Sequence, residues 1–445
     1  MTRSINKQNI NTFRDDFNKS DIYRLTRNAL TRSELKKVAM DWDRFSSINH
    51  NFSNTISNEL PATNQNTTGR CWIFAALNLL RIKVARKFKL EKFELSQSYI
   101  YFWDKFEKAN FFLENIMETA NEPLESRIVS YLNNDPLQDG GQWHMFTNLI
   151  EKYGIVPKDI YPEQEACFNS NEMKYILTYK LREDGIVLRE MIANCINKDQ
   201  LQKEKEKMMN EIFRMLSIHM GTPPTSFNWE FQDKDKKFHS YRDLTPQSFL
   251  KQHVKCNVED YICLVHSPRE VITPFNKTYT IQYLGNVIEG REIKYVNVEI
   301  EELKNAAKKS IQHDDPVWFG CDVGKKFHRD LGIMDFNLYD YNLVYDTKFK
   351  MTKEMRMRSG ESMMTHAMLF TGVNIVDDKP VKWKVENSWG EEKGNKGYFI
   401  MTDNWFDEYM FEVAIEKKYL PKSILEIEQQ KPITLPPWDP LGSLA

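Results

Sequence analysis

The stretch Gln65-Asn-Thr-Thr-Gly-Arg-Cys71-Trp72-Ile-Phe-Ala75 decides how the rest of this chain is interpreted. A cysteine stands directly before an apolar run whose three- and four-residue spacing predicts a helix from Trp72 to Phe88. Backbone N–H groups and the helix dipole at such a helix start favour the thiolate, so we expect a lowered thiol pKa. The amide of Gln65, six residues upstream, can donate to an oxyanion. The stretch therefore predicts a nucleophilic cysteine beside an oxyanion hole.

Two later segments supply the partners that a nucleophilic thiol requires. Met364-Thr-His366-Ala-Met368 offers an imidazole as general base, and Val385-Glu-Asn387-Ser-Trp389-Gly390 offers an amide that orients it and a ring that shields their contact. Each residue alone is commonplace, because an isolated buried cysteine usually belongs to a core. Their order along the chain, first glutamine, then cysteine, histidine and asparagine, is what favours a catalytic interpretation. The predicted catalytic residues are Cys71, His366 and Asn387, with Gln65 and the Cys71 backbone N–H as the oxyanion hole.

The composition is that of an ordinary globular protein. Of 445 residues, 41% are hydrophobic and 28% charged, enough for two or three core-sized units. The 61 Lys+Arg and 63 Asp+Glu give a net charge of −2, which favours neither nucleic acid nor a membrane surface as partner. The first residues are polar and no apolar run reaches the roughly 18 residues of a membrane span. We therefore expect a cytoplasmic protein.

The cysteines and histidines indicate no metal site or other cofactor. Six cysteines without a Cys-x-x-Cys pair are too few for a disulfide scaffold, so all six are expected to be reduced. Apart from Cys71, the cysteines are expected to be small buried apolar residues: Cys167, Cys195, Cys256, Cys263 and Cys321. The histidines other than His366 show no ligand spacing.

The pattern along the chain predicts an α+β fold with two lobes across a cleft. Ser96 is the expected N-cap of a second helix, and a third runs from Trp143 to Tyr153 and ends at Gly154. Beyond residue 315, strand-like runs dominate. The expected segments are 1–60, which wraps around the body; 61–160, a helical lobe with the nucleophile; 161–305, an inserted helical domain; 306–430, a β-rich lobe with His366 and Asn387; and 431–445, a Pro-rich tail.

A glycine pair lies at the start of the third predicted helix. Asp139-Gly140-Gly141-Gln142 has two interpretations. One is a turn with an N-cap. The other is an extended backbone that pairs with a peptide substrate, where the missing side chains permit close contact.

Several stretches together resemble a known family. They are Thr68–Phe74, Leu95–Tyr99, Asp139–Trp143, Glu151–Pro157, Val317–Gly324, Met364–Met368 and Val385–Glu391. These resemble the bleomycin hydrolase family of papain-like cysteine peptidases, which includes bacterial aminopeptidase C. The sequence Gly-Arg-Cys-Trp, where papain has Gly-Ser-Cys-Trp, is typical of this branch.

The resemblance carries expectations of its own. It implies a papain-like body of a helical lobe and a β-barrel-like lobe, with a large inserted oligomerisation domain. It also implies a cytosolic homohexamer whose active sites face a closed chamber, and removal of N-terminal residues from peptides and of bleomycin-type amides through an acyl-enzyme. It favours Gly140, Gly141 and Trp389 as substrate-binding residues.

The tail Pro437–Ala445 resembles the end of the family's chains, which lies in the cleft. A carboxylate at Ala445 would there pair with the α-ammonium of a substrate and block room upstream of the scissile bond. The branch usually has Met and Ala where this chain has Leu441 and Ser443. The alternative is a disordered C-terminal tail.

Two other functions stay open. Transglutaminase-like acyl transfer usually pairs the histidine with Asp, whereas Asn387-Ser-Trp-Gly favours hydrolysis. A hexameric nucleic-acid-binding shell is implied by the basic channel of some relatives, but this chain has near-neutral charge and no long basic cluster. Salt-dependent retention on DNA would distinguish it.

Overall fold

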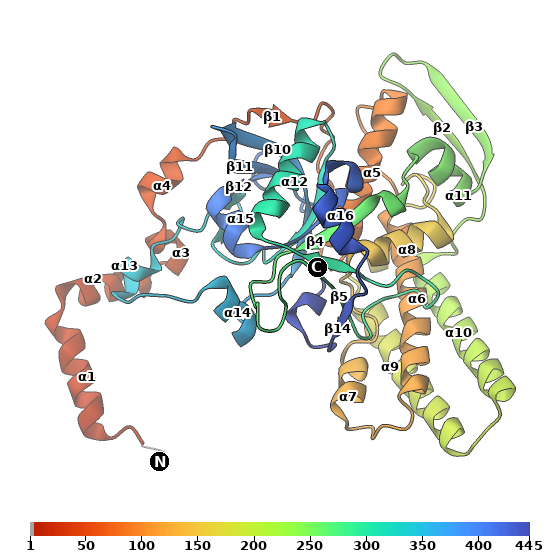
Figure 1. The fold of residues 1–445 in the computed structure, drawn as a ribbon, viewed down its shortest axis with the longest axis horizontal. Helices are drawn as coiled ribbons and strands as arrows, with labels where there is room; N and C mark the ends of the chain where they lie inside the picture. The colour runs from red at the N-terminus through yellow and green to blue at the C-terminus, as the bar shows by residue number, and fades with distance from the viewer. Residues whose placement is uncertain (1–3) are drawn as a thin grey trace.

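A single mixed sheet forms the centre of the computed structural model, which describes residues 4–445 (Figure 1). In sheet order the strands are β14 (Ile433–Leu435), β5 (Lys277–Ile281), β6 (Tyr295–Asn297), β4 (Tyr261–Val265), β13 (Met410–Glu416), β7 (Val317–Cys321), β10 (His366–Val376), β11 (Lys379–Glu386), β12 (Tyr398–Thr402), β9 (Ile333–Met334) and β8 (Phe327–His328), with β1 (Asn54–Thr55) paired to β10. From β4 through β12 the central strands are antiparallel neighbours. The order brings β10 and β11, which carry the predicted histidine and asparagine, side by side.

Helices cover both faces of the central strands. On one face α12 (Ile300–Gln312) and α15 (Asp403–Tyr409) close a core with Phe319, Phe370 and Trp383. On the other face lies α5 (Cys71–Phe88), backed by α6 (Gln97–Glu118) and α8 (Trp143–Tyr153). Because α5 is packed between the sheet and these helices, 15 of its 18 residues are buried, including the polar Asn78 and Arg81.

The predicted helix boundaries in this lobe are confirmed. Ser96 is the N-cap of α6 and its hydroxyl accepts a hydrogen bond from the Tyr99 N–H at 3.1 Å. The helix α8 ends at Gly154, whose φ of +72° is unfavourable for other residues. A Cβ there would also lie 2.2 Å from the carbonyl carbon of Pro246. The glycine is therefore required both by conformation and by space.

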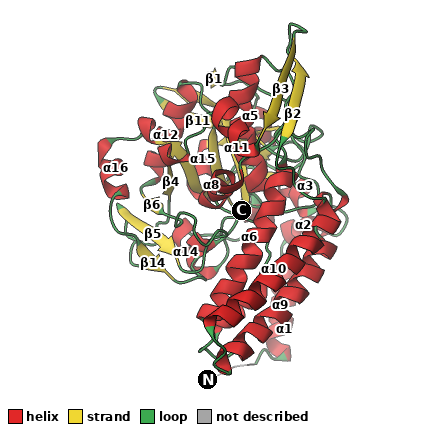
Figure 2. Cartoon of the chain, turned by 90° about the vertical axis from the view of Figure 1, so that its right-hand side faces the viewer, coloured by secondary structure: helices red, strands yellow, loops and turns green. Residues whose placement is uncertain are grey.

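The sheet extends across the predicted boundary of the inserted domain. Two long helices, α9 (Asn171–Ala193) and α10 (Lys198–Met220), run alongside α6 below the sheet, and the hairpin β2–β3 (Phe227–Gln232 and Phe238–Leu244) projects at the other end (Figure 2). The segment from Tyr261 to Asn297, however, contributes β4, β5 and β6 to the main sheet. The expected limit at residue 305 therefore does not separate an insert from the β-rich lobe.

The N-terminal helices do not wrap around the body as expected. Figure 1 shows α1 (Lys7–Lys19) and α2 (Asp21–Leu30) extending away from the sheet, and neither helix buries a residue. Tyr23 on α2 donates a hydrogen bond to Asp346 at 2.6 Å, but packing against the body begins later, at α3 (Leu35–Ala39) and α4 (Trp42–Ser47), where Arg44 pairs with the buried Asp335. The α1–α2 apolar side chains have no core of their own chain to cover them.

The remaining short helices connect these parts. They are α7 (Arg127–Asn134), α11 (Pro246–Phe249), α13 (Tyr341–Tyr345), α14 (Lys353–Ser359), α16 (Lys422–Glu428), four 3₁₀ turns (Glu165–Cys167, Val258–Asp260, Lys417–Tyr419 and Pro440–Gly442) and a π-helical turn at Leu250–Val254. Within residues 4–445 no helix combines the length and apolarity that crossing a bilayer requires.

All six cysteines are free thiols, as expected. The expectation that every cysteine besides Cys71 is buried is wrong for two of them. Cys195 is exposed and Cys256 is only partly buried. Cys195 lies just beyond the end of α9, at the tip of the helical pair, where no core backs it.

Candidate active site

Cys71 is the first residue of α5 and is almost fully buried. The preceding Arg70 gives no side-chain cap, because its guanidinium forms a two-point contact with Glu163 at 3.1 and 2.8 Å. Burial raises the pKa of the Cys71 thiol to about 11, against the opposing effect of the Ala367, Trp72 and Cys71 backbone N–H groups. The expected lowering of the pKa is therefore wrong for this closed cleft, because desolvation outweighs the amides of the helix start.

His366 and Asn387 come together through neighbouring strands. His366 opens β10, Asn387 follows the last residue of β11, and the ring Nε2 lies 2.9 Å from Asn387 Oδ1. Burial lowers the pKa of His366 to about 4, while the Asn387 contact opposes this shift. Each charge alone is thus disfavoured by burial.

Trp389 covers the histidine. Its ring centroid lies 4.9 Å from that of His366, and the Arg329 guanidinium lies 4.5 Å from its centroid. The indole also packs against Phe327 and Phe399. These contacts hold Trp389 against the imidazole, the position expected for a ring that excludes water from the His366–Asn387 contact.

Gln65 is buried in the loop that precedes α5. Its amide nitrogen donates to the Thr68 carbonyl at 2.6 Å, and its amide oxygen accepts from the Ser388 hydroxyl at 2.6 Å. Since an amide nitrogen carries two hydrogens, one remains for an oxyanion. The backbone N–H of Gln65 also donates to the Ser388 carbonyl at 2.8 Å. The loop before the cysteine is therefore fixed to the residue after Asn387.

The glycine pair lies between α5 and the end of the chain. A Cβ on Gly141 would stand 2.4 Å from the Trp72 ring, and a Cβ on Gly140 would stand 2.7 Å from Leu444 Cβ. The Gly141 N–H donates to the Ala445 backbone oxygen at 3.2 Å. Only glycine permits the Trp72 ring on one side and the chain end on the other to approach this segment so closely.

The C-terminal residues are packed against the body rather than free. Ala445 is 4% exposed, and the Gln142 amide donates to the Ser443 carbonyl at 2.6 Å. Asp439 and Arg269, both buried, form a two-point ion pair with distances of 2.7 and 3.1 Å. The chain end lies near the middle of the outline in both views (Figures 1 and 2).

The sequence interpretation missed two buried lysines behind the glycine pair. Lys108 donates to the carbonyls of Gln138 and Gly140 at 2.7 Å each, and burial lowers its pKa to about 8. Lys105 lies 3.1 Å from Asp139, whose carbonyl accepts from the Trp72 indole N–H at 2.7 Å. Charges at 104, 105 and 108 within a run of aromatic residues were the available signal.

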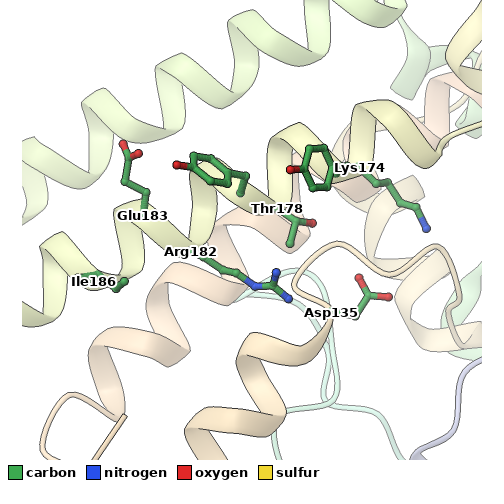
Figure 3. A pocket seen from close by; sticks show the side chains of 8 residues that line it. Asp135, Lys174, Thr178, Arg182, Glu183 and Ile186 are labelled. Atoms are coloured by element: carbon green, nitrogen blue, oxygen red, sulfur yellow. The ribbon is translucent and has the colours of Figure 1, made fainter. Parts of the chain in front are cut away.

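In the described part of the chain no three His, Cys, Asp or Glu side chains cluster as metal ligands. A surface pocket of about 540 Å³ lies along α9, lined among others by Asp135, Lys174, Thr178 and Arg182 (Figure 3). Lys174 also lies 3.1 Å from Asp139, so the pocket and the glycine segment share one ion-pair network.

A cysteine at the start of α5, next to the Ala367 N–H of β10, together with a histidine–asparagine contact across adjacent strands, is the arrangement of a papain-like cysteine peptidase. The family model described as Peptidase C1-like family matches residues 4–442. Bleomycin hydrolase of Rattus norvegicus is 44% identical over 450 residues, covering 99% of both chains. Aminopeptidase C of Lactobacillus delbrueckii subsp. lactis is 41% identical over 448 residues, covering 100% of this chain and 99% of the relative. The crystal structure of PepW from Lactobacillus rhamnosis covers 100% of both chains at 43% identity, with a TM-score of 0.98.

The chain therefore belongs to the peptidase C1-like family, in the branch of bleomycin hydrolase and aminopeptidase C. This confirms the predicted family and the enzyme class, a cysteine-type aminopeptidase of α+β papain-like fold.

Proposed function

We propose that this enzyme removes N-terminal residues from peptides, and cleaves bleomycin-type amides, through a Cys71–His366–Asn387 site and an acyl-enzyme. The observation that carries the proposal is the hydrogen bond from the Gly141 N–H to the Ala445 oxygen. A chain end in that position occupies the path of residues upstream of a scissile bond. A substrate then fits only when its own N-terminus lies close to Cys71.

The chemistry follows from the groups described. Cys71 Sγ attacks the substrate carbonyl carbon while its proton passes to His366. The oxyanion accepts hydrogen bonds from the Cys71 N–H and the free hydrogen of the Gln65 amide. His366 then gives the proton to the leaving amine, and a thioester remains. Water, deprotonated by His366, attacks the thioester and releases the amino acid and the thiol.

The tail supplies the selectivity in this proposal. The Ala445 carboxylate pairs with the α-ammonium of the substrate, and this contact is strong because its surroundings are largely dry. The backbone of Gly140 and Gly141, next to the tail, pairs with the substrate. Trp389 covers His366 on the opposite side of the substrate.

The enzyme acts as a homohexamer in this proposal, and its partners are peptides with a free N-terminus. Support comes from apolar side chains left uncovered by their own chain. Ile22 and Leu25 on α2 are 65% and 71% exposed, and Tyr175 and Tyr179, which line the α9 pocket, are 69% and 64% exposed. Patches of this kind mark protein–protein contacts. The six free cysteines fit a cytoplasmic location, where thiols stay reduced.

The direct test is hydrolysis of an aminoacyl fluorogenic amide in reducing buffer. Cys71→Ala should lose turnover by at least about three orders of magnitude while its melting temperature stays close to wild type, because only the nucleophile is removed. Cys195→Ala, which removes an exposed thiol, is the control and should keep full activity. Iodoacetamide should inactivate both the wild type and the control. Substantial turnover by Cys71→Ala would overturn the assignment.

A further inference from the structure

We propose that the buried ion pair between Arg81 and Glu386 is a positioning device that aligns Asn387 and Gln65 with the helix of the nucleophile. The inference rests on the proposed function and concerns two residues that touch neither substrate nor the reacting atoms.

The pair joins the two lobes at a fully buried point. Arg81 lies on α5 about three turns beyond Cys71. Its Nη2 donates to Glu386 Oε1 at 2.7 Å, and the two side chains are 2% and 1% exposed. Glu386 ends β11 and is the residue immediately before Asn387. One contact therefore connects the helix that presents the thiol to the strand end that presents the amide.

The same guanidinium also holds the chain that leads to the oxyanion hole. Arg81 Nη2 donates to the Pro61 carbonyl at 2.8 Å, four residues before Gln65. Next to it, the Tyr398 hydroxyl donates to the Leu60 carbonyl at 2.7 Å, and Tyr398 is the register partner of Glu386 on β12. The Arg81 side chain, which lies on the helix of Cys71, therefore contacts both the end of the strand before Asn387 and the segment that leads to Gln65.

Few side-chain contacts orient Asn387, although its backbone N–H donates to the Gly397 carbonyl at 3.2 Å. Its Oδ1 contacts the His366 ring at 2.9 Å and accepts from the Ser388 N–H at 2.7 Å. Its amide nitrogen is buried without a hydrogen-bond partner in the described chain. The orientation of the amide is therefore set by the backbone that Glu386 anchors. A small shift there would weaken the contact that stabilises the imidazolium.

The chain offers a matched control on the same helix. Arg86 lies on α5 and also bridges to the other lobe, with Nη2 2.8 Å from Asp314 Oδ1 and Nη1 2.8 Å from the Asp314 carbonyl. This pair is partly exposed, at 27% and 43%, and neither partner is next to a predicted catalytic residue. It has the same chemistry without the connection to the site.

The test compares Arg81→Met/Glu386→Gln with Arg86→Met. The double variant removes both buried charges together, so it avoids leaving one of them unpaired. We expect its kcat to fall about tenfold or more with KM within about twofold. The alkylation of Cys71 by iodoacetamide, followed by peptide mapping, should become slower at neutral pH and shift to higher pH, because a less supported imidazolium withdraws the thiol proton less readily. Arg86→Met should keep both properties near wild type.

The outcomes separate the inference from the proposed function. A folded double variant with wild-type kcat and an unshifted alkylation profile would reduce the pair to a structural role. If the double variant yields no folded protein, Arg81→Lys, which keeps a buried cation with a different hydrogen-bond geometry, is measured by the same criteria. An inactive wild type would contradict the proposed function itself. An active wild type whose variants keep the wild-type kcat and alkylation profile would contradict only the positioning role.

Discussion

Burial dominates the chemistry of Cys71. The helix start supplies the amides that favour a thiolate, yet desolvation raises the thiol pKa to about 11. His366 is shifted the other way, to a pKa of about 4, by the same cause. Burial therefore disfavours the charged form of both side chains, and in the proposed mechanism the thiol reacts as its proton passes to His366. Sensitivity of Cys71 to mild oxidants should depend on that proton transfer.

Glu412 on β13 gives a pH prediction that is independent of activity. Burial raises its pKa to about 8 from an ordinary 4.5, and its Oε1 has no partner in the described chain. Below pH 4.5 both folded and unfolded states are protonated. As pH rises towards 8 only the folded state keeps the proton, so stability falls. Glu412→Gln should abolish this loss and be about 1–3 kcal/mol more stable than wild type near pH 8.5, measured by urea unfolding.

Glu416 on the same strand is the matched control. Burial acts to raise its pKa, but Lys418 and Lys83 outweigh burial and hold the pKa below its ordinary value. Its contribution is therefore present at neutral pH and lost in acid, and Glu416→Gln should be less stable than wild type at pH 8.5. Equal stability of wild type and Glu412→Gln across this pH range would contradict the assignment of a neutral buried carboxyl.

At this scale the sequence predicted the contact between His366 and Asn387, which the structure shows, but not the buried Arg81–Glu386 ion pair beside it. Cys71, His366 and Asn387 stand in a recognisable order, and the structure brings His366 and Asn387 into contact. Arg81 and Glu386 read as ordinary surface charges, because such residues are rarely buried. Their contact spans 305 residues of sequence, and no local pattern reports a partner at that distance.

Among the elements, local signals succeeded and long-range pairing did not. The periodicity and caps gave both ends of α5 and α8 and the start of α6 to within a residue or so, because these signals lie inside each helix. The membership of β4, β5 and β6 in the main sheet was missed. Their partners in that sheet include β13, more than a hundred residues later in the chain, and pairing of that kind leaves no local trace.

The glycine segment gives a prediction at the scale of an element. In Gly140→Ala the new Cβ would stand 2.7 Å from Leu444 Cβ and 2.8 Å from the Ala445 oxygen, so the chain end must move. We expect kcat/KM for a free-amine substrate to fall about tenfold, because the amine anchor is displaced. Gly324→Ala is the control, since a Cβ there meets nothing within 4 Å and its activity should be unchanged. Wild-type kinetics of Gly140→Ala would show that the tail is not part of the substrate site.

For the whole molecule, the uncovered N-terminal helices are the feature that a single chain does not explain. α1 and α2 bury no residue, yet Phe13, Ile22 and Leu25 on them are apolar and 59%, 65% and 71% exposed. The sequence-based prediction that residues 1–60 wrap around the body failed for these two helices. An amphipathic pattern indicates that one helix face is covered, but it does not indicate which chain covers it.

Deletion of residues 1–33 tests the role of these helices in assembly. Because the segment 4–30 buries nothing in its own chain, the unfolding midpoint of the isolated body should change little. Light scattering after size-exclusion chromatography should report a smaller particle than the hexamer proposed for the wild type. An unchanged particle mass would contradict the proposed role of this arm.

The most direct test of the central claim is the rate of hydrolysis of two substrates by the wild-type enzyme in reducing buffer. One is an aminoacyl fluorogenic amide with a free amine, and the other is its N-acetylated twin. We expect cleavage of the free-amine substrate alone, blocked by iodoacetamide, and a gain of activity on the acetylated twin when Leu444 and Ala445 are deleted. Equal cleavage of both by the wild type would keep the Cys71–His366 chemistry but contradict an aminopeptidase governed by its own C-terminus.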